Sequence, residues 1–251
     1  MKAAYHPTVS VCMATFNGDR FLEAQVRSIL QEMGPADELL ISDDLSTDQT
    51  RMLIDRSCAD PRVRLVGHSR AGGVVRNFER VLTQATGDLI VLSDQDDVWL
   101  PGKLALVREQ LQQADLVMLD GWVVNENLVR TGQRVSDAVP PRSGFLRNFY
   151  KNSYVGCCMA FRSDLLRTVL PFPAGVVWHD WLIALVAERR FRVVRSHADT
   201  ILYRRHGGNH SPTGAGPRSL SLTVVRHRLQ MAWALAWVTV RGWFRPTGNG
   251  R

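Results

Sequence analysis

Three carboxylates within four residues, Asp94-Gln95-Asp96-Asp97, offer the clearest chemistry in this sequence. They directly follow an apolar run, residues 89–93, which reads as a buried strand that delivers them into a loop. Carboxylates spaced as Asp94 and Asp96 are can bind one hard cation together, and Mg²⁺ or Mn²⁺ prefers oxygen ligands while keeping positions open for a substrate phosphate. An acidic cluster alone is often a solvated loop. Its place after a buried strand favours a metal site that serves a phosphorylated substrate.

A second acidic pair, Asp43-Asp44, ends another short apolar run and is followed by Ser46 and Asp48. Either Ser46 or Asp48 would cap a helix that follows. Capping does not explain two adjacent aspartates ahead of it. A carboxylate at this point could accept the ring N–H of a pyrimidine base, so we expect Asp43 or Asp44 to contact a base and Ser46 or Asp48 to be the cap.

The elements that carry both clusters alternate between strand and helix. Apolar runs predict strands at residues 9–14, 38–42, 63–67 and 89–93, and helical periodicity predicts helices at 19–31, 48–57 and 76–84. Such alternation is typical of a parallel sheet covered on both faces. Ligands bind such sheets at the carboxyl ends of the strands. The exit after the first strand, Thr15-Phe16-Asn17, should therefore lie beside the two acidic exits.

The second half of the chain has a weaker pattern. We expect a helix at 101–113, strands at 116–119, 155–161 and 191–194, a loop at 139–143 and a helix at 180–188. We interpret this half as the part that shapes an acceptor site.

Beyond residue 206 the composition changes twice. Residues 207–218 are rich in Gly, Pro and Ser and indicate a mobile loop or linker. Residues 220–244 predict an amphipathic helix with Trp233, Trp237 and Trp243 and flanking arginines. Its uncharged stretch, 229–240, is too short to span a bilayer. Tryptophan and arginine around a short apolar stripe favour a helix in the membrane interface, and the alternatives are packing on the catalytic domain or on a second subunit.

The overall charge limits the classes of partner. Lys and Arg number 31 against 24 Asp and Glu, a net charge of +7 in 251 residues, which favours anionic partners. The arginines are spread along the chain, and no RNA-binding or helix-turn-helix signature is present in the sequence, so we expect no nucleic-acid partner. Phosphorylated small molecules and anionic lipid headgroups remain.

Cysteine spacing and the first residues indicate the compartment. Cysteines at 12, 58, 157 and 158 form no Cys-x-x-Cys motif, and we predict buried free thiols in a reducing compartment. The sequence before Asn17 lacks an apolar stretch long enough for a signal peptide. We therefore expect a cytoplasmic protein, peripheral at the inner face of the cytoplasmic membrane.

Four segments in the right order resemble the family 2 inverting glycosyltransferases. They are Val-Ser-Val-Cys-Met-Ala-Thr-Phe-Asn-Gly (9–18), Ile-Ser-Asp-Asp-Leu-Ser-Thr-Asp-Gln-Thr (41–50), Gly-Asp-Leu-Ile-Val-Leu-Ser-Asp-Gln-Asp-Asp-Val-Trp (87–99) and His-Asp-Trp (179–181). The last segment, with Tyr-Arg-Arg-His-Gly-Gly-Asn (203–209), is similar to the rhamnosyltransferase-like subgroup. The resemblance implies an α/β glycosyltransferase A fold with a mostly parallel central sheet flanked by helices.

The resemblance also assigns roles to residues. Thr15 and Asn17 would line the nucleotide, Asp43 or Asp44 would contact the base, and Asn77 would lie near the sugar or diphosphate. Further residues are expected to bind substrate or metal. Asp94 and Asp96 would be the Asp-x-Asp pair on Mg²⁺ or Mn²⁺, His206 would meet the metal or the diphosphate, Asp180 would be the general base, and Gln95, Trp99, His179 and Trp181 would contribute to substrate binding. His179 replaces the acidic residue common in the family before that aspartate, which leaves its own role open.

The implied domain organisation has three parts. A glycosyltransferase A catalytic domain would span residues 1–210, with a nucleotide-sugar half at 1–100 and an acceptor half at 101–210. Residues 211–251 would form a linker and an amphipathic helix for membrane association or dimerisation.

The implied reaction is transfer of a sugar with inversion. Charge growing on the departing nucleoside diphosphate calls for a divalent cation, and a carboxylate on the opposite face removes the proton of the attacking hydroxyl. The subgroup segments favour dTDP-L-rhamnose as donor and a lipopolysaccharide, O-antigen or other surface polysaccharide as acceptor, and a UDP-hexose is the principal alternative. A Rossmann dehydrogenase is disfavoured because Thr-Phe-Asn-Gly replaces a Gly-x-Gly-x-x-Gly turn. A non-catalytic sugar-nucleotide-binding module would have no use for Asp180.

Overall fold

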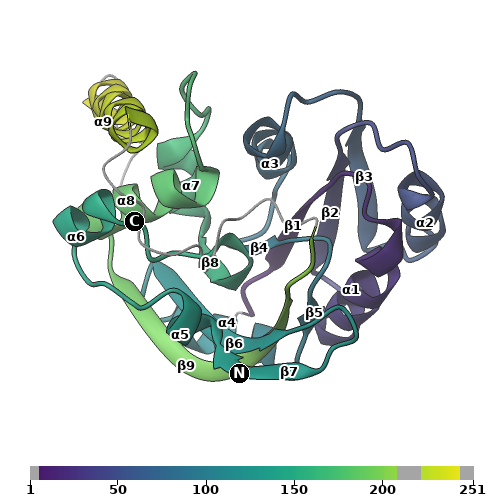
Figure 1. Cartoon of the computed structure of the whole chain (residues 1–251). Helices are drawn as coiled ribbons and strands as arrows, with labels where there is room; N and C mark the ends of the chain where they lie inside the picture. The colour runs from purple at the N-terminus through teal and green to yellow at the C-terminus, as the bar shows by residue number, and fades with distance from the viewer. Residues whose placement is uncertain (1–5, 208–221, 244–251) are drawn as a thin grey trace, which may run out of the picture.

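The computed structural model describes residues 6–207 and 222–243. Figure 1 shows one curved sheet that runs through these residues, with helices on its two faces. The elements follow in chain order. They are β1 (Val9–Thr15), α1 (Asp19–Glu32), β2 (Glu38–Asp43), α2 (Thr50–Ser57), β3 (Val63–His68), α3 (Val74–Thr83), β4 (Leu89–Ser93), β5 (Val98–Trp99), α4 (Lys103–Gln110), β6 (Leu116–Val124), β7 (Arg130–Arg134), α5 (Val135–Ala138), α6 (Phe145–Tyr150), the 3-10 helix η1 (Gly156–Cys158), β8 (Met159–Arg162), α7 (Ser163–Val169), α8 (His179–Arg190), β9 (Val193–Arg204) and α9 (Leu222–Trp243).

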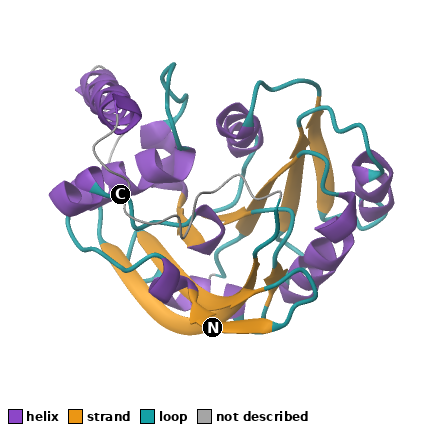
Figure 2. Cartoon of the chain, in the orientation of Figure 1, coloured by secondary structure: helices purple, strands orange, loops and turns teal. Residues whose placement is uncertain are grey.

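The first half of the sheet is parallel, as the alternation of strand and helix predicts. Strands run in the order β3-β2-β1-β4, and β1 pairs in parallel with both β2 and β4. Thr15 is level with Asp43, and Met13 is level with Ser93. The three exits that carry the polar residues therefore meet at one edge. Helix α3 packs on β1 and β2, and α1 and α2 lie on the opposite side of these strands (Figure 2).

The second half of the sheet is mixed. β8 runs antiparallel between β4 and β6, β9 is parallel to β6, and the two-residue β5 pairs antiparallel with β9. This order returns the chain from its second half to β5, which follows the last strand of the first half. In particular, Val98 pairs with Leu202. The end of β9 therefore lies beside the residues that directly follow the Asp94 to Asp97 loop. The expected α/β architecture with a mostly parallel central sheet is confirmed.

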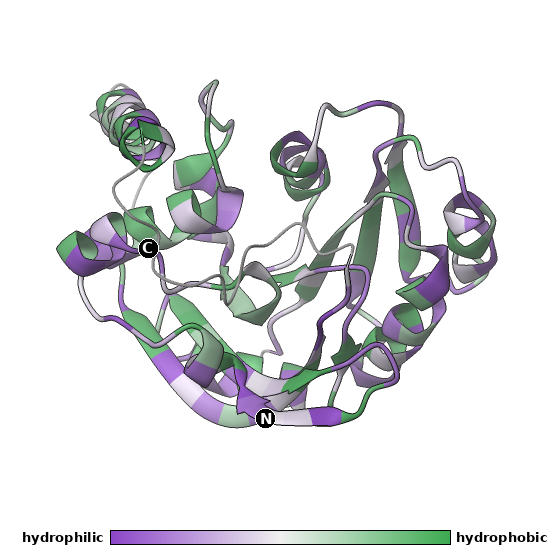
Figure 3. Ribbon diagram, viewed as in Figure 1, coloured by the Kyte–Doolittle hydropathy of each residue, from purple (hydrophilic) through white to green (hydrophobic). Residues whose placement is uncertain are grey.

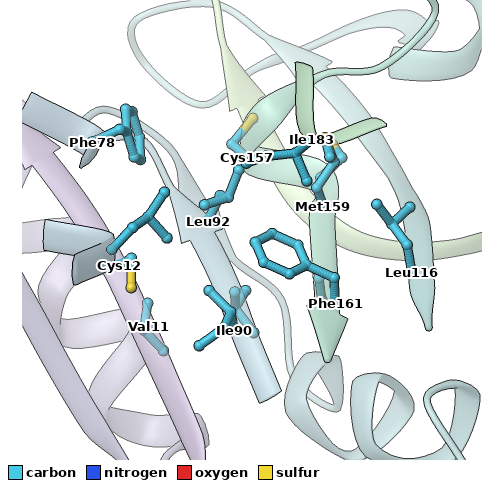
Figure 4. Packing of buried hydrophobic residues seen from close by; sticks show 14 of the residues in the cluster. Val11, Cys12, Phe78, Ile90, Leu92, Leu116, Cys157, Met159, Phe161 and Ile183 are labelled. Atoms are coloured by element: carbon cyan, nitrogen blue, oxygen red, sulfur yellow. The ribbon is translucent and has the colours of Figure 1, made fainter. Parts of the chain in front are cut away.

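The core explains why the halves form one body. The side chains of β4 are wholly buried, with β1 on one side and β8 on the other. Figure 4 shows this continuous packing, which includes Val11, Cys12, Ile90, Leu92, Met159 and Phe161. Each large apolar side chain withdrawn from water contributes about 2 kcal/mol. Figure 3 shows the corresponding hydrophobic colouring along the central strands.

Several element boundaries differ from the sequence-based predictions. The segment predicted as a strand at 155–161 begins as the 3-10 helix η1, and β8 starts only at Met159. The strand predicted at 191–194 continues to Arg204, because β9 pairs with β6 along most of its length. Helix α2 begins at Thr50 with Gln49 at the N-cap position, so neither Ser46 nor Asp48 occupies that position as expected. Cys58 is exposed, which corrects the prediction of four buried thiols, although all four are free.

Helix α9 is half buried. Met231, Ala234, Leu235 and Val238 face the domain, where the helix packs on α7 and α8. Within residues 6–207 and 222–243, no helix is both long enough and apolar enough to cross a lipid bilayer. The predicted linker at 207–218 and the stretch Gly208-Asn209 lie outside the described residues, apart from Gly207.

Candidate active site

The exits of β1 and β2 are joined by a network around Asp43. Its carboxylate is fully buried and accepts hydrogen bonds from Thr15 Oγ1 (2.8 Å), the Ser46 N–H (2.8 Å) and His68 Nδ1 (2.9 Å). Burial alone would raise the pKa of Asp43, but hydrogen bonds from Ser46, Thr15 and His68 outweigh it and lower the pKa. Asp43 is therefore an ionised acceptor that the protein itself satisfies.

Asp44 has a comparable set of protein donors. Its carboxylate accepts backbone N–H groups from Ala71, Gly72 (3.3 Å) and Gly73 (2.9 Å), in the loop that leads into α3. The base contact predicted for Asp43 or Asp44 stays a prediction. Of the two carboxylates, only that of Asp44 is partly exposed.

Asn17 and Gln95 hold the neighbouring loops in place. Asn17 has a positive φ of 46°, its N–H donates to Ser46 Oγ, and its side-chain oxygen accepts the N–H of Thr47. Gln95 accepts the N–H of Phe16 and donates back to the Phe16 carbonyl, at 2.9 and 3.0 Å. The two predicted substrate residues thus link three strand exits, and the exposed Asn17 still faces solvent.

Asn77 is buried on α3 behind these exits. It donates to the Thr15 carbonyl (3.0 Å) and accepts from Ser42 Oγ (2.7 Å) and Arg80 (3.0 Å). Arg80 also donates to the carbonyl of Asp43. The sequence-based prediction did not include Arg80, which brings a cation to the back of the nucleotide side.

The carboxylates of the acidic cluster after β4 have different neighbours. Carboxylate oxygens of Asp94 and Asp97 and Sγ of Cys157 lie within 4.8 Å of one another. Burial and the charges of Asp96 and Asp180 raise the pKa of Asp94 to about 7. Burial, Asp96 and Asp94 likewise raise the pKa of Asp97 well above its usual range. Asp97 is fully buried, and its Oδ2 has no hydrogen-bond partner in the part of the chain that the structure describes.

Asp96 contacts residues at and just after the end of β9. Its Oδ2 lies 2.8 Å from His206 Nε2, and the His206 ring packs against Phe21 with centroids 4.9 Å apart. Arg204 donates from its side chain to the Asp96 carbonyl (2.6 Å) and from its backbone to Asp97 (2.9 Å). Two of the three residues predicted to hold a metal, Asp96 and His206, are therefore in direct contact.

Asp180 lies in the first turn of α8 and is half-buried. It accepts the Trp181 N–H at 2.7 Å, and the backbone N–H of Gly156 also interacts with it. Burial raises the pKa of Asp180 to about 6. Asp180 lies close enough to Asp94 for its charge to affect the pKa of Asp94, so carboxylates 86 positions apart in sequence converge on one place.

The residues on either side of Asp180 belong to the core. The His179 ring stacks on Phe78 at a centroid distance of 3.9 Å, and burial lowers the pKa of His179 to about 3, so the ring is neutral. Trp181 is buried and donates to the Asn148 carbonyl at 2.9 Å. Trp99 is buried as well. Substrate contact by these three residues stays a prediction, and their observed role is packing.

Residues 10–170, more than half of the chain, match the family model described as "Glycosyl transferase family 2". The chain belongs to glycosyl transferase family 2.

Curated relatives of this family 2 chain differ in their named activities. A dTDP-rhamnosyl transferase RfbG of Shigella flexneri is 26% identical over 215 residues, which cover 78% of this chain and 72% of the relative. The UDP-Glc:alpha-D-GlcNAc-diphosphoundecaprenol beta-1,3-glucosyltransferase WfgD of Escherichia coli is 26% identical over 165 residues, 66% of this chain. That match spans 64% of the WfgD length. Of these two relatives, RfbG is named as a rhamnosyltransferase and WfgD as a glucosyltransferase, so they do not agree on a donor.

Solved structures share the fold at low identity. S. aureus TarS 1-349 in complex with UDP-GlcNAc superposes with a TM-score of 0.66 at 19% identity, covering 96% of this chain and 74% of that one. The mannosyltransferase PcManGT of Pyrobaculum calidifontis, in complex with GDP-Man and Mn²⁺, gives a TM-score of 0.62 at 17% identity over 98% of this chain and 77% of that one.

The residues of this family 2 chain fit a divalent cation. The predicted ligands, carboxylate oxygens of Asp94 and Asp96 and an imidazole nitrogen of His206, are of the kind that suits Mg²⁺ or Mn²⁺. That all three bind one cation stays a prediction, because the group that lies within 4.8 Å is Asp94 with Asp97 and Cys157. The raised pKa of Asp94 has part of its cause in the negative charges of Asp96 and Asp180, which a bound cation would offset. The buried Oδ2 of Asp97 without a partner marks the same excess of acceptors.

Sequence reasoning missed Arg80, Arg204 and Lys103. Each is a basic residue in a segment where a solvent-exposed side chain is the usual expectation, yet Lys103 is fully buried and Arg204 is 4% exposed. For Arg204, the Tyr-Arg-Arg-His segment that carries His206 was the available signal.

Proposed function

We propose that the chain is an inverting, divalent-metal-dependent glycosyltransferase that uses a nucleoside-diphosphate sugar. The single observation that carries the proposal is the convergence of three carboxylates: the charges of Asp96 and Asp180 both act on Asp94, although Asp94 and Asp96 follow β4 and Asp180 lies in α8. A module that only bound sugar nucleotides would need the first two and not the third.

The residues have distinct roles in this mechanism. A divalent cation held by Asp94, Asp96 and His206 would balance the negative charge that builds on the departing nucleoside diphosphate. Asp180 accepts the proton of the acceptor hydroxyl as that oxygen attacks the anomeric carbon from the face opposite the leaving group, so the configuration inverts. With its pKa raised to about 6, Asp180 is ionised at neutral pH and is a stronger base than an ordinary carboxylate.

The first candidate donor is dTDP-L-rhamnose and the second is a UDP-hexose. The RfbG relative supports the first over 78% of this chain, and the WfgD relative supports the second over 66%. Both donors carry a pyrimidine, which suits a carboxylate-lined base site beside Asp44. The acceptor is a lipopolysaccharide, O-antigen or other surface-polysaccharide intermediate, in line with the diphosphoundecaprenol acceptor in the name of WfgD and with the name of a colanic acid biosynthesis relative.

A donor panel tests this function. Thermal shift with Mn²⁺ should select dTDP-rhamnose over UDP-glucose, UDP-GlcNAc and GDP-mannose, and transfer or slow hydrolysis of the selected donor should stop on addition of EDTA. Preference for a UDP-sugar would select the second candidate. Tight donor binding with neither transfer nor hydrolysis would favour a binding module instead.

Helices α6 and α9 support a cytoplasmic membrane surface as the place of action. Large exposed apolar side chains gather on these two helices, and Arg228 of α9 donates to the Tyr150 carbonyl of α6 at 2.7 Å. The exposed apolar residues are Leu146, Tyr150, Leu222, Val225, Leu229, Trp233 and Val240. Neither helix contains an acidic residue, and Arg147 and Arg226 are exposed on them, which suits anionic headgroups.

Vesicle binding tests this surface. Wild-type protein should sediment with phosphatidylglycerol vesicles and not with phosphatidylcholine vesicles, and the double variant Leu229→Ser, Trp233→Ser should lose most of that binding. Met52→Ser, at an exposed methionine on α2, is the matched control and should bind as wild type does. A wild-type dimer that these two serines convert to a monomer, with no vesicle binding, would assign the surface to a second copy.

A further inference from the structure

Lys103 is a lysine in an unusual place. It is the first residue of α4, its side chain is fully buried, and it ranks among the largest side chains with no exposed surface. Its ammonium donates to the Cys157 carbonyl at 3.2 Å and lies 4.2 Å from the centre of the Trp99 ring. Lysine is almost never fully buried unless its charge has partners.

The charge of Lys103 also acts at longer range on the carboxylates of the exit loop. Burial lowers the pKa of Lys103, and the acidic groups of Cys158, Cys157, Asp97 and Asp94 act in the opposite direction. The same ammonium lowers the pKa of Asp94. Asp97 is fully buried as well and accepts the backbone N–H of Arg204.

The contacts of Lys103 connect the two sides of the candidate site. Trp99 follows the loop that carries the proposed metal ligands, whereas Cys157 belongs to η1, on the other half of the chain. Sγ of Cys157 also lies within 4.8 Å of carboxylate oxygens of Asp94 and Asp97. The residue before Cys157 is Gly156, whose N–H interacts with Asp180. A Cβ on Gly156 would lie only 3.5 Å from the Cβ of Asp180, which shows how closely this turn packs on the base.

We infer that Lys103 is a positioning residue: through its contacts with Trp99 and the Cys157 carbonyl, its buried ammonium ties the end of the Asp94 to Asp97 loop to the η1 turn and supplies a counter-charge to that loop. The inference rests on the proposed function, because the loop matters as the platform for metal and diphosphate. Lys103 has no exposed surface with which to contact a substrate. It acts through the carboxylates and the Cys157 carbonyl, and a side chain of similar length without charge would fill the space and leave the loop unanchored.

The experiment compares three variants of the full chain. Lys103→Met removes the charge and keeps the length, Leu104→Ala removes apolar contacts at the next, equally buried residue of α4, and Lys151→Met removes an exposed lysine. Affinity for Mn²⁺ together with dTDP or UDP, whichever wild type binds more tightly, is measured by calorimetry below the melting temperature of every variant.

We expect Lys103→Met to lose about tenfold or more in this affinity, as is typical for residues that orient metal ligands from behind. Leu104→Ala should melt at a lower temperature with wild-type affinity, and Lys151→Met should match wild type in both. Unchanged affinity in Lys103→Met, or equal loss in Leu104→Ala, would overturn the inference. Wild type that binds neither diphosphate with Mn²⁺ would remove the proposed function and this inference together.

A double variant keeps the inference testable if Lys103→Met fails to fold. Lys103→Met, Asp97→Asn removes one charge of each sign and keeps an oxygen to accept the Arg204 N–H. The double variant should fold and melt at a higher temperature than Lys103→Met. If the destabilisation by the two substitutions is additive, or if the double variant folds no better than Lys103→Met, Lys103 is not the counter-charge.

Discussion

Two groups of carboxylates have opposite electrostatics. The first is Asp43 at the end of β2, and the second combines Asp94, which follows β4, with Asp180 of α8. Asp43 has donors from Thr15, Ser46 and His68, and its pKa is lowered in spite of burial. Asp94 and Asp180 have fewer hydrogen-bond donors, Asp94 also has carboxylate neighbours, and burial raises the pKa of both groups. The difference lies in hydrogen-bond partners, since the more deeply buried Asp43 has the lower pKa. The Asp43 side is satisfied within the protein, whereas the side of Asp94 and Asp180 has an excess of negative charge that would suit a cation and a proton.

The largest expected effect is on the base. Asp180→Asn should reduce transfer by about 10³-fold or more, because an amide cannot accept the hydroxyl proton, while donor affinity with Mn²⁺ stays within about threefold of wild type. Single-turnover kinetics and calorimetry measure the two quantities. Asp164→Asn, at a surface carboxylate paired with Arg167, is the control and should change neither. Equal loss of binding and transfer would reject the assignment of Asp180 as base.

Next comes the metal side. Asp94→Asn should lower transfer by about 100-fold and abolish stimulation by Mn²⁺, because one of the proposed ligands is lost. In EDTA the same variant should melt at a higher temperature than wild type, since it removes a charge that Asp96 and Asp180 oppose. A lower melting temperature in EDTA would contradict the view that this side carries uncompensated charge.

The nucleotide side should respond in the reverse way. Asp43→Asn should destabilise the fold by about 1–3 kcal/mol, because the buried site is built from donors to a charged acceptor. Urea denaturation in EDTA measures this free energy, with Asp55→Asn, at an exposed residue of α2, as control. If Asp43→Asn and Asp94→Asn shift stability in the same direction, the contrast between the two groups does not hold.

The smallest effect is the dependence of stability on pH. A carboxyl whose pKa is higher in the folded than in the unfolded state contributes stability as pH falls through the folded pKa. With folded pKa values of about 7 for Asp94 and about 6 for Asp180, metal-free protein should gain a few degrees in melting temperature between about pH 8 and pH 5, relative to Asp94→Asn. Scanning calorimetry of both proteins in EDTA measures the difference, and parallel curves would contradict it.

The nucleotide half was predictable because its signals are local. Each strand from β1 to β4 is a short apolar run with a helix after it, and the polar exits follow from parallel pairing. The second half was less predictable because its pairings are long-range. β9 is twelve residues long and contains Arg195, His197 and Asp199, so no apolar pattern shows that it runs beside β6.

The candidate site shows the same division. The convergence of Asp94, Asp96 and Asp180 was expected from a resemblance over distant segments. The contact between Asp96 and His206, and the burial of Lys103, depend on how β9 and α4 pack after the chain has folded. Residue type alone gave no reason to place a lysine in the core.

The stack of His179 on Phe78 limits how this chain can be re-engineered. Phe78 follows Asn77 on α3, behind the ends of β1 and β2. Its ring packs against His179 in the first turn of α8. Trimming that ring would remove the surface on which His179, the residue next to Asp180, is stacked. A substitution at Phe78 would therefore disturb Asp180 through its neighbour, and changes intended to keep the position of Asp180 should begin in the exposed loop around Asn17 instead.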